Sequence, residues 1–125
     1  MSGALSFHAG LVAEHRVTAL YQDSGCYLLA ERWRCAYGEI DLIFQDPKTG
    51  GLIFAEVKKS RSIAVAVARL TPAQIRRIYH AAQLFVADQP LGQLTEMRFD
   101  AALVDVAGFV EIVENAFMDL AWGIE

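Results

Sequence analysis

The stretch that decides the fold is GEIDLIFQDPKTGGLIFAEVKKSR, residues 38–61. It holds two runs of strand-forming residues, 38–45 and 51–58, joined by a segment rich in the turn formers Asp, Pro and Gly. This pattern predicts a β-hairpin. Charged side chains nevertheless stand inside both runs, Asp41 in the first and Glu56 with Lys58 in the second. Strands that build a core seldom carry such residues, so these charges need a reason.

The register of the hairpin is expected to bring its two acids together. If the inner ends of the runs face each other, antiparallel pairing places Asp41 opposite Glu56. Opposed side chains lie about 5 Å apart at Cβ, where two negative charges repel by roughly 3 kcal/mol at an effective dielectric near 20. Strand alternation adds Lys58 to the face of Glu56 and Glu39 to the face of Asp41. The repulsion between the acids must therefore be relieved.

Three arrangements would relieve it: a divalent cation between Asp41 and Glu56, a proton on one acid, or a salt bridge to Lys58 alone. Oxygen ligands without nearby His or Cys suit Mg²⁺ or Mn²⁺, which bind through one or two carboxylates plus water and a phosphate. Lys58 could then hold or deprotonate an attacking water while the cation polarises a phosphoryl oxygen. The competing interpretation is a surface hairpin with solvated charges, because the spacing Glu-x-Lys is a weak signal by itself.

The remaining sequence predicts helices and further strands around this hairpin. The middle helix begins with Thr71 as N-cap, Pro72 at its first position and Gln74 to complete a capping box. A strand reached across that helix can return parallel to its predecessor, so we expect a mixed sheet with helices against it. The expected elements are a helix over 4–21, strands over 26–34, 38–45 and 51–58, a helix over 72–87, and strands over 97–106 and 109–113.

The first helix is expected to bury an apolar stripe on one side, with Glu14 next to it. The residues of that stripe are Leu5, Leu11, Val12, His15, Ala19 and Leu20.

Length and composition limit the class of protein. The 125 residues have the usual size of one domain, and 54% hydrophobic with 21% charged residues is ordinary for a soluble globular protein. No run approaches the roughly 18 apolar residues of a membrane span, and the first residues lack signal-peptide features, so we expect a cytoplasmic protein without a membrane partner. Cys26 and Cys35 lack metal-binding spacing, and residues 115–125 are expected to form an apolar tail.

The charge is unevenly distributed along the chain. The net charge is −4, yet residues 57–87 contain no acid, and the rest of the chain carries all fifteen Asp and Glu side chains. A local basic patch can act on a phosphate backbone despite an acidic total, because the field at a cleft depends on nearby charge. The basic side chains of this segment are Lys58, Lys59, Arg61, Arg69, Arg76 and Arg77.

Four motifs in order carry a family resemblance over nearly the whole chain. GEIDLI at 38–43 and IFAEVK at 53–58, followed by RFD at 98–100 and NAF at 115–117, resemble the YraN-like family of small bacterial proteins. That family is similar to Holliday junction resolvases of the PD-(D/E)XK nuclease superfamily. The resemblance implies an α/β protein with a restriction-endonuclease-like fold, its mixed central sheet flanked by helices in the order α-β-β-β-α-β-β. It also implies one endonuclease-like domain over residues 1–125, with Mg²⁺ or Mn²⁺ as cofactor.

The resemblance also implies roles for particular residues. Asp41 and Glu56 would bind the metal ion, and Lys58 would be the catalytic lysine of the D…E-x-K motif. Glu14 would match an acid on the first helix that faces the metal, unless it is a solvated helix residue. Glu39 fits the Gly-Glu-x-Asp pattern, and its role stays open between binding metal, orienting Lys58 and capping the strand.

Two positions depart from the family pattern. Ser60 stands where the family has a basic residue, and strand alternation would turn Arg61 away from the site unless a bulge intervenes. Gln74 stands where the family tends to carry Lys. Other superfamily nucleases have Gln there, but the capping box favours a purely structural role.

The expected partner is nucleic acid, with DNA favoured over RNA, and a homodimer is left open. Phosphate contacts are expected from the basic segment, although helix residues 76 and 77 could instead form a solvated polar face; no base-reading motif is present. We therefore expect a metal-dependent endonuclease acting on structured or branched nucleic acid. The alternatives are an inactive nucleic-acid-binding or assembly module and a protein-interaction domain that uses the tail around Trp122. The residues expected to contact phosphates are Lys59, Arg61, Arg69, Arg76 and Arg77.

Overall fold

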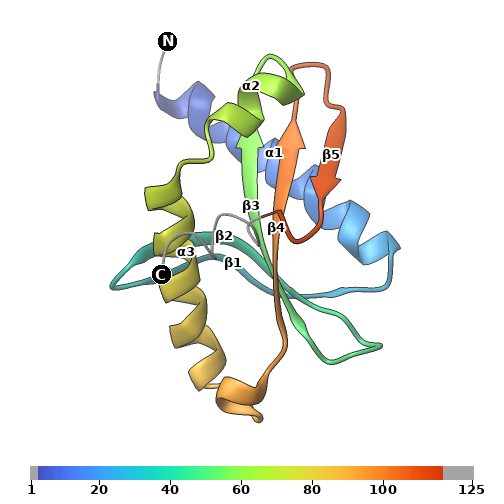
Figure 1. Cartoon of the computed structure of the whole chain (residues 1–125). Helices are drawn as coiled ribbons and strands as arrows, with labels where there is room; N and C mark the ends of the chain where they lie inside the picture. The colour runs from blue at the N-terminus through green and yellow to red at the C-terminus, as the bar shows by residue number, and fades with distance from the viewer. Residues whose placement is uncertain (1–2, 117–125) are drawn as a thin grey trace.

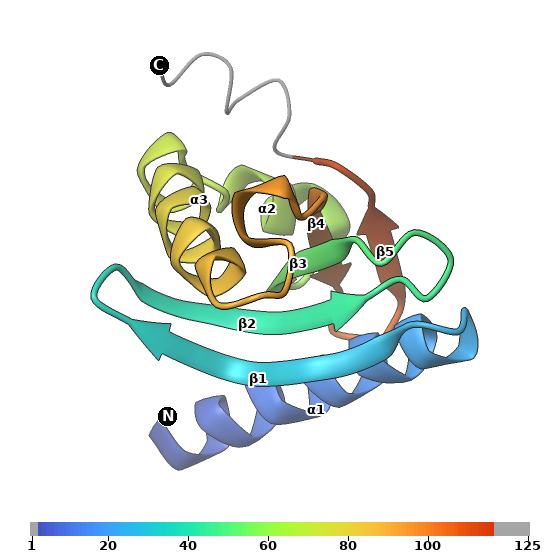
Figure 2. The same cartoon turned by 90° about the horizontal axis from the view of Figure 1, so that it is seen from below.

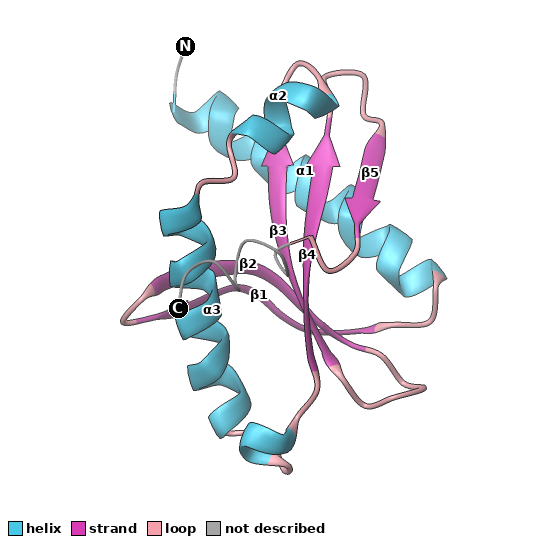
Figure 3. Cartoon of the chain, viewed as in Figure 1, coloured by secondary structure: helices cyan, strands magenta, loops and turns pink. Residues whose placement is uncertain are grey.

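The computed structural model describes residues 3–116, with side chains from residue 10 onward. Phe117 of the NAF motif, Trp122 and the rest of the expected tail lie outside the described residues. Figures 1 and 3 show helices packed on a single sheet. The elements in order are α1 (Gly3–Asp23), β1 (Tyr27–Cys35), β2 (Gly38–Gln45), β3 (Leu52–Lys59), α2 (Ile63–Ala68), α3 (Pro72–Ala87), the short 3₁₀ helix η1 (Gly92–Leu94), β4 (Met97–Val104) and β5 (Val110–Val113).

The five strands form one mixed sheet in the order β1-β2-β3-β4-β5. β3 and β4 pair in parallel across the α2 and α3 connection, and all other neighbours are antiparallel. The expected mixed sheet with flanking helices is therefore confirmed. The hairpin register is also confirmed, because Gln45 pairs with Leu52 and the ladder continues to Leu42 and Ala55.

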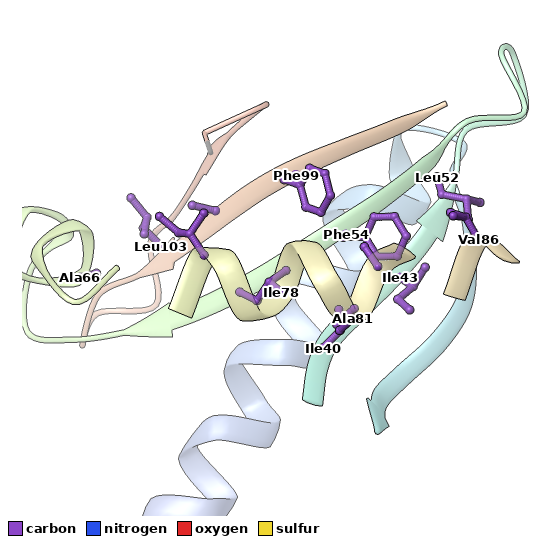
Figure 4. Packing of buried hydrophobic residues seen from close by; sticks show 13 residues of the cluster. Ile40, Ile43, Leu52, Phe54, Ala66, Ile78, Ala81, Val86, Phe99 and Leu103 are labelled. Carbon is purple, nitrogen blue, oxygen red and sulfur yellow. The ribbon is translucent and has the colours of Figure 1, made fainter. Parts of the chain in front are cut away.

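Two apolar layers lie on opposite faces of the sheet. Figure 2 shows α1 on one face and α2 with α3 on the other. Under α3, Phe54 stacks on Phe99 with ring centroids 5.4 Å apart, and Ile78 packs nearby (Figure 4). Under α1, Tyr21 stacks on Phe44 at 4.2 Å. Both faces of β3 are thus covered, which explains its nearly continuous apolar run.

The buried stripe of α1 differs from the expected one. Ala13, Val17 and Tyr21 face the sheet, whereas Val12 and Leu20 are exposed. The apolar residues of this helix are spread around its circumference, so periodicity alone did not choose between two faces. The actual face follows i, i+4, i+8 spacing. The Leu5 side chain lies outside the described residues.

The sequence predicted the start of α3 but not the short helix α2. The sequence of α2, IAVAVA, alternates β-branched residues as a strand would, yet the Ser62 hydroxyl accepts the Val65 N–H and starts a helix. α3 begins where expected, with the Thr71 hydroxyl accepting the Gln74 N–H at 3.2 Å.

The sheet divides at the end of the β2–β3 ladder. Pairing between β2 and β3 stops at Leu42 and Ala55, while β3 and β4 stay paired to Lys59 and Val104. In Figure 1 the β1–β2 hairpin accordingly turns across the sheet toward α3. Asp41, the next residue of β2, therefore lies at the point where the two strands separate.

Candidate functional site

Asp41 and Glu56 meet at this division of the sheet. The Asp41 side chain takes over where the backbone ladder stops, since its Oδ2 accepts the Val57 N–H at 2.8 Å. Its carboxyl group also lies close enough to the Glu56 carboxyl to raise the pKa of Glu56. The predicted proximity of the two acids is therefore confirmed, one residue beyond the last ladder pair.

Burial makes Glu56 hard to ionise. Only 4% of the residue is exposed. This burial raises the pKa of Glu56 well above its ordinary value, and the hydrogen bond and charge of Asp41 raise it further, whereas Lys58 and Arg77 lower it. Without a cation, Glu56 is therefore the acid that favours its protonated form, and a proton on one acid is one of the three arrangements that the sequence suggested.

Three donors from β3 and α3 converge on the Oε2 atom of Glu56. The Lys58 ammonium lies 3.9 Å away and the Arg77 Nη2 atom 3.8 Å away. The Gln74 amide donates a hydrogen bond at 3.0 Å. Lys58 is on the face of Glu56, as predicted, while Gln74 and Arg77 come from one turn of α3.

The prediction that the Gln74 side chain serves only to complete a capping box is therefore wrong. Its backbone N–H is capped by Thr71, but its amide group reaches the sheet instead of closing the capping box. A buried carboxyl needs a hydrogen-bond donor more than an exposed helix end does. Gln74 thus belongs to the site.

Glu14 faces the same site from α1. It is not a solvated helix acid, because it forms an ion pair of 2.6 Å with Arg32. Burial raises its pKa and the hydrogen bond from Arg32 opposes that rise, while the charges of Asp41 and Glu39 add to it. Arg32 was not singled out in the sequence, and no sequence signal marks it. It adopts the left-handed backbone conformation, with φ of 45°.

Glu39 supports the site through its backbone. Its carboxylate pairs with Arg34 at 3.2 Å, and its carbonyl oxygen accepts a hydrogen bond from Arg77 Nη1 at 2.9 Å. Gly38 makes room for this contact, because a Cβ atom there would lie 2.7 Å from Arg77 Nη1. Arg77 therefore links the start of β2 to Glu56 of β3.

The other basic residues do not converge on the acids. Lys59 lines a small cavity beside α1, on the other face of β3, and Arg69 donates to the Lys59 carbonyl at 2.7 Å. The β3–β4 ladder runs without a register shift to Lys59, and Arg61 lies beyond it, in the bend before α2. Within residues 10–116, the exposed side chains of Arg61 and Arg76 have no hydrogen-bond or ion-pair partner.

Asp41 and Glu56 would supply a divalent cation with a small number of protein ligands. Among the described residues, no three His, Cys, Asp or Glu side chains form a ready metal site. Asp41 and Glu56 are nevertheless two neighbouring oxygen ligands, and a cation could replace the proton that Glu56 favours. Mg²⁺ often binds through one or two carboxylates and keeps several waters, so this donor set is adequate.

The RFD and NAF motifs meet on the α1 side of the sheet, where Asp100 of β4 pairs with Ala55 of β3. Asp100 is fully buried and accepts two hydrogen bonds from Arg98, one from the Tyr21 hydroxyl and one from the Asn115 N–H. Burial and the charge of Asp100 raise the Tyr21 pKa well above its usual range. These motifs therefore tie α1, β4 and the segment after β5 together.

Comparison with known proteins shows which family the chain belongs to. Residues 13–104 match the uncharacterised protein family UPF0102. The chain belongs to this family. The matched range includes both acids and every donor around Glu56, and UPF0102 is the YraN-like family that the motifs predicted.

Individual UPF0102 proteins are similar over almost their full length. One from Cereibacter sphaeroides is 55% identical over 94% of this chain and 98% of its own. One from Roseobacter denitrificans is 48% identical over 94% and 90%, and one from a Ruegeria species is 46% identical over 92% and 91%. Within the described residues, no helix is both long and apolar enough to cross a bilayer.

Proposed function

We propose that this UPF0102 protein is a metal-dependent endonuclease that hydrolyses phosphodiester bonds of structured or branched nucleic acid, DNA before RNA. The observation that carries the proposal is that Asp41, fixed by the Val57 N–H, and Glu56 meet where β2 and β3 separate, with the Lys58 ammonium 3.9 Å from Glu56. The order of elements and the separation of β2 from β3 agree with a restriction-endonuclease-like fold of the PD-(D/E)XK type. The fold assignment is part of the same proposal.

In this proposal Asp41 and Glu56 hold Mg²⁺ or Mn²⁺. When bound, the cation would supply Lewis-acid polarisation of a phosphoryl oxygen and offset the charge that develops there. The chain fixes both acids beforehand, since Val57 donates to Asp41 and Gln74 donates to Glu56. Such fixed ligands need little rearrangement on binding.

Lys58 has the position of a water-holding group. Its ammonium lies 3.9 Å from Glu56, which is too long for a strong hydrogen bond and leaves its donors available. It would hold the water whose oxygen adds to phosphorus while the bond from phosphorus to the leaving sugar oxygen breaks. Arg77, beside Glu56, would contact a non-bridging phosphate oxygen.

A cleavage assay tests this function. Branched, single-stranded and duplex DNA and RNA are incubated with purified protein and Mn²⁺ or with EDTA. We expect metal-dependent cleavage of at least one structured substrate, lost in Asp41→Asn, Glu56→Gln and Lys58→Met. Lys48→Ala is the control for general loss of positive charge, because Lys48 is exposed in the turn between β2 and β3, at the end of β3 away from Lys58. Cleavage that persists in all three site variants would contradict the proposal.

A second candidate function is a binding or assembly module with this fold and no turnover. It is favoured by Ser60 and by Arg61, which leave Lys58 without the second basic side chain of the family pattern. Metal-independent binding of nucleic acid without cleavage in any metal would support it.

A further inference from the structure

An exposed aromatic pair lies at the tip of the β1–β2 hairpin. The loop of this hairpin has two residues, Ala36 and Tyr37, and the Tyr37 ring stacks on His80 of α3 with centroids 5.3 Å apart and planes 29° apart. Tyr37 is 47% exposed and His80 is exposed as well. Cys35, just before the loop, packs against the core, whereas the Tyr37 ring lies at the surface.

The pair is next to the candidate site. Arg77 binds the Glu39 carbonyl with one guanidinium nitrogen and lies near Glu56 with another. Tyr37 precedes this part of the hairpin by two residues, and His80 follows Arg77 by one turn of α3. Figures 1 and 2 both show the hairpin tip beside α3. A strand of nucleic acid that passes the acids would therefore reach the pair.

The charge around the pair suits a phosphate backbone. Arg76 lies one turn before His80 on α3, and Arg34 is exposed near the tip of the hairpin. Residues 57–87, which include α3, contain no acid. Glu39 is the acid nearest in sequence, and Arg34 neutralises it. Exposed aromatic rings among basic side chains are how proteins hold unpaired bases.

We propose that Tyr37 and His80 form a stacking platform for an unpaired nucleobase next to the phosphodiester at the candidate site. This inference rests on the proposed function and narrows its substrate class to nucleic acid with a single-stranded nucleotide beside the cleavage point. The platform distinguishes unpaired from paired bases, because a base inside a duplex cannot offer its face to a ring.

Binding measured without cleavage tests the platform. In EDTA, fluorescence anisotropy is used with a single-stranded oligonucleotide, a duplex with an overhang and a blunt duplex. We expect Tyr37→Ala to weaken binding of the two unpaired substrates on the order of ten-fold and to leave blunt duplex binding unchanged. Tyr37→Phe should bind like wild type. Tyr27→Ala is the matched control, since Tyr27 is 60% exposed at the start of β1, the end of that strand away from the Tyr37 loop.

A fourth variant separates stacking from packing. Tyr37→Leu keeps an apolar contact with His80 and should keep the wild-type melting temperature, but it has no aromatic face. We expect it to lose affinity as Tyr37→Ala does, and to stop quenching the fluorescence of 2-aminopurine in the oligonucleotide. If wild type and Tyr37→Leu bind single strands equally, the platform is wrong while the endonuclease proposal stands. If wild type binds no nucleic acid, both proposals fail.

Discussion

Asp41 Oδ2 accepts the Val57 N–H at 2.8 Å, one residue beyond the last β2–β3 pair. A side chain thus substitutes for the backbone at the point where the two strands separate. The strands would otherwise leave this half-buried N–H without an acceptor from β2. The same bond fixes the Asp41 carboxyl beside Glu56. One hydrogen bond thus follows the last ladder pair and also positions an acid of the site.

Divalent cations should bind only while both carboxyl groups are present. Calorimetric titration of wild type with Mn²⁺ is expected to give weak binding, and Asp41→Asn and Glu56→Gln are each expected to abolish it, because one carboxylate seldom holds a hydrated cation. Glu111→Gln, an exposed acid on β5, is the control for loss of one negative charge. Identical heats for wild type and both site variants would reject the metal assignment.

The metal-free protein should become less stable as pH rises. Its native Glu56 pKa is above the ordinary value of 4.5, so the stability that protonated Glu56 contributes is complete below about pH 4.5 and is lost as pH rises toward the native pKa. One such group changes the free energy of unfolding by at most about 1.4 kcal/mol per pH unit. Glu14 acts in the same direction, so the comparison needs a variant at Glu56 alone.

Urea unfolding in EDTA between pH 5 and pH 8 measures this effect. Glu56→Gln keeps a neutral partner for Gln74 and should lose less stability than wild type over that range. Its stability relative to wild type should therefore increase with pH. Parallel curves for the two proteins would mean that Glu56 ionises normally in the native state.

Gly38 should tolerate no side chain, because of Arg77. Gly38 has φ of 115°, and an added Cβ would lie 2.7 Å from Arg77 Nη1, so Gly38→Ala is expected to cost more than about 1 kcal/mol of unfolding free energy. Gly50→Ala is the control for the backbone term alone, since Gly50 has φ of 75° and open space around it.

A double-mutant cycle isolates the contact between Gly38 and Arg77. In the Arg77→Ala background, Gly38→Ala should cost no more than Gly50→Ala does, because only the conformational strain is left. An unchanged cost in that background would show that the clash with Arg77 is unimportant.

The sequence predicted the parts of this site that depend on strand periodicity. Register and alternation were sufficient to bring Asp41, Glu56 and Lys58 together, because the turn and the two apolar runs allow one pairing. The order of elements likewise predicted a mixed sheet. Both features depend on local patterns with period two, which a single sequence displays directly.

Contacts that cross between elements were not predictable in the same way. Gln74 completes a capping box in the sequence, and only the position of α3 over β3 shows that its amide reaches Glu56. Arg32 and Glu14 are eighteen residues apart and pair only because α1 lies against β1 and β2. The strand-like composition of α2 was overruled by the Ser62 cap.

The backbone at Arg32 should prefer glycine. Arg32→Ala and Arg32→Gly both remove the ion pair with Glu14, but at φ of 45° only glycine avoids steric strain, so the Gly variant should be more stable by about 1 kcal/mol. Arg34 on the same strand has no such backbone conformation, and Arg34→Gly should be less stable than Arg34→Ala. If the Gly variant is less stable than the Ala variant at position 32 as well as at position 34, the backbone at Arg32 is not strained.

These variants also test Glu14 as a metal ligand. Arg32→Ala frees Glu14, so Mn²⁺ affinity should rise several-fold if Glu14 joins Asp41 and Glu56 around the cation. The double variant with Glu14→Gln should return to the wild-type affinity or below. Unchanged affinity in Arg32→Ala would exclude Glu14 from the ligand set.

Asp100 should be important for stability and unimportant for metal binding. Asp100→Asn removes the buried charge that pairs with Arg98, which then keeps a longer ion pair with Glu114 at 3.7 Å, and it removes an acceptor from Tyr21, so we expect a loss of about 3 to 5 kcal/mol. Tyr21→Phe removes one hydrogen bond to a buried charge and should cost about 1.5 to 3 kcal/mol. Thermal unfolding measures both losses. Tyr21→Phe, the milder change, should bind Mn²⁺ as wild type does, because the Asp100 network lies on the α1 side of the sheet, whereas Glu56 contacts α3 on the other side. Weaker Mn²⁺ binding by folded Tyr21→Phe would mean that this network also positions the metal site.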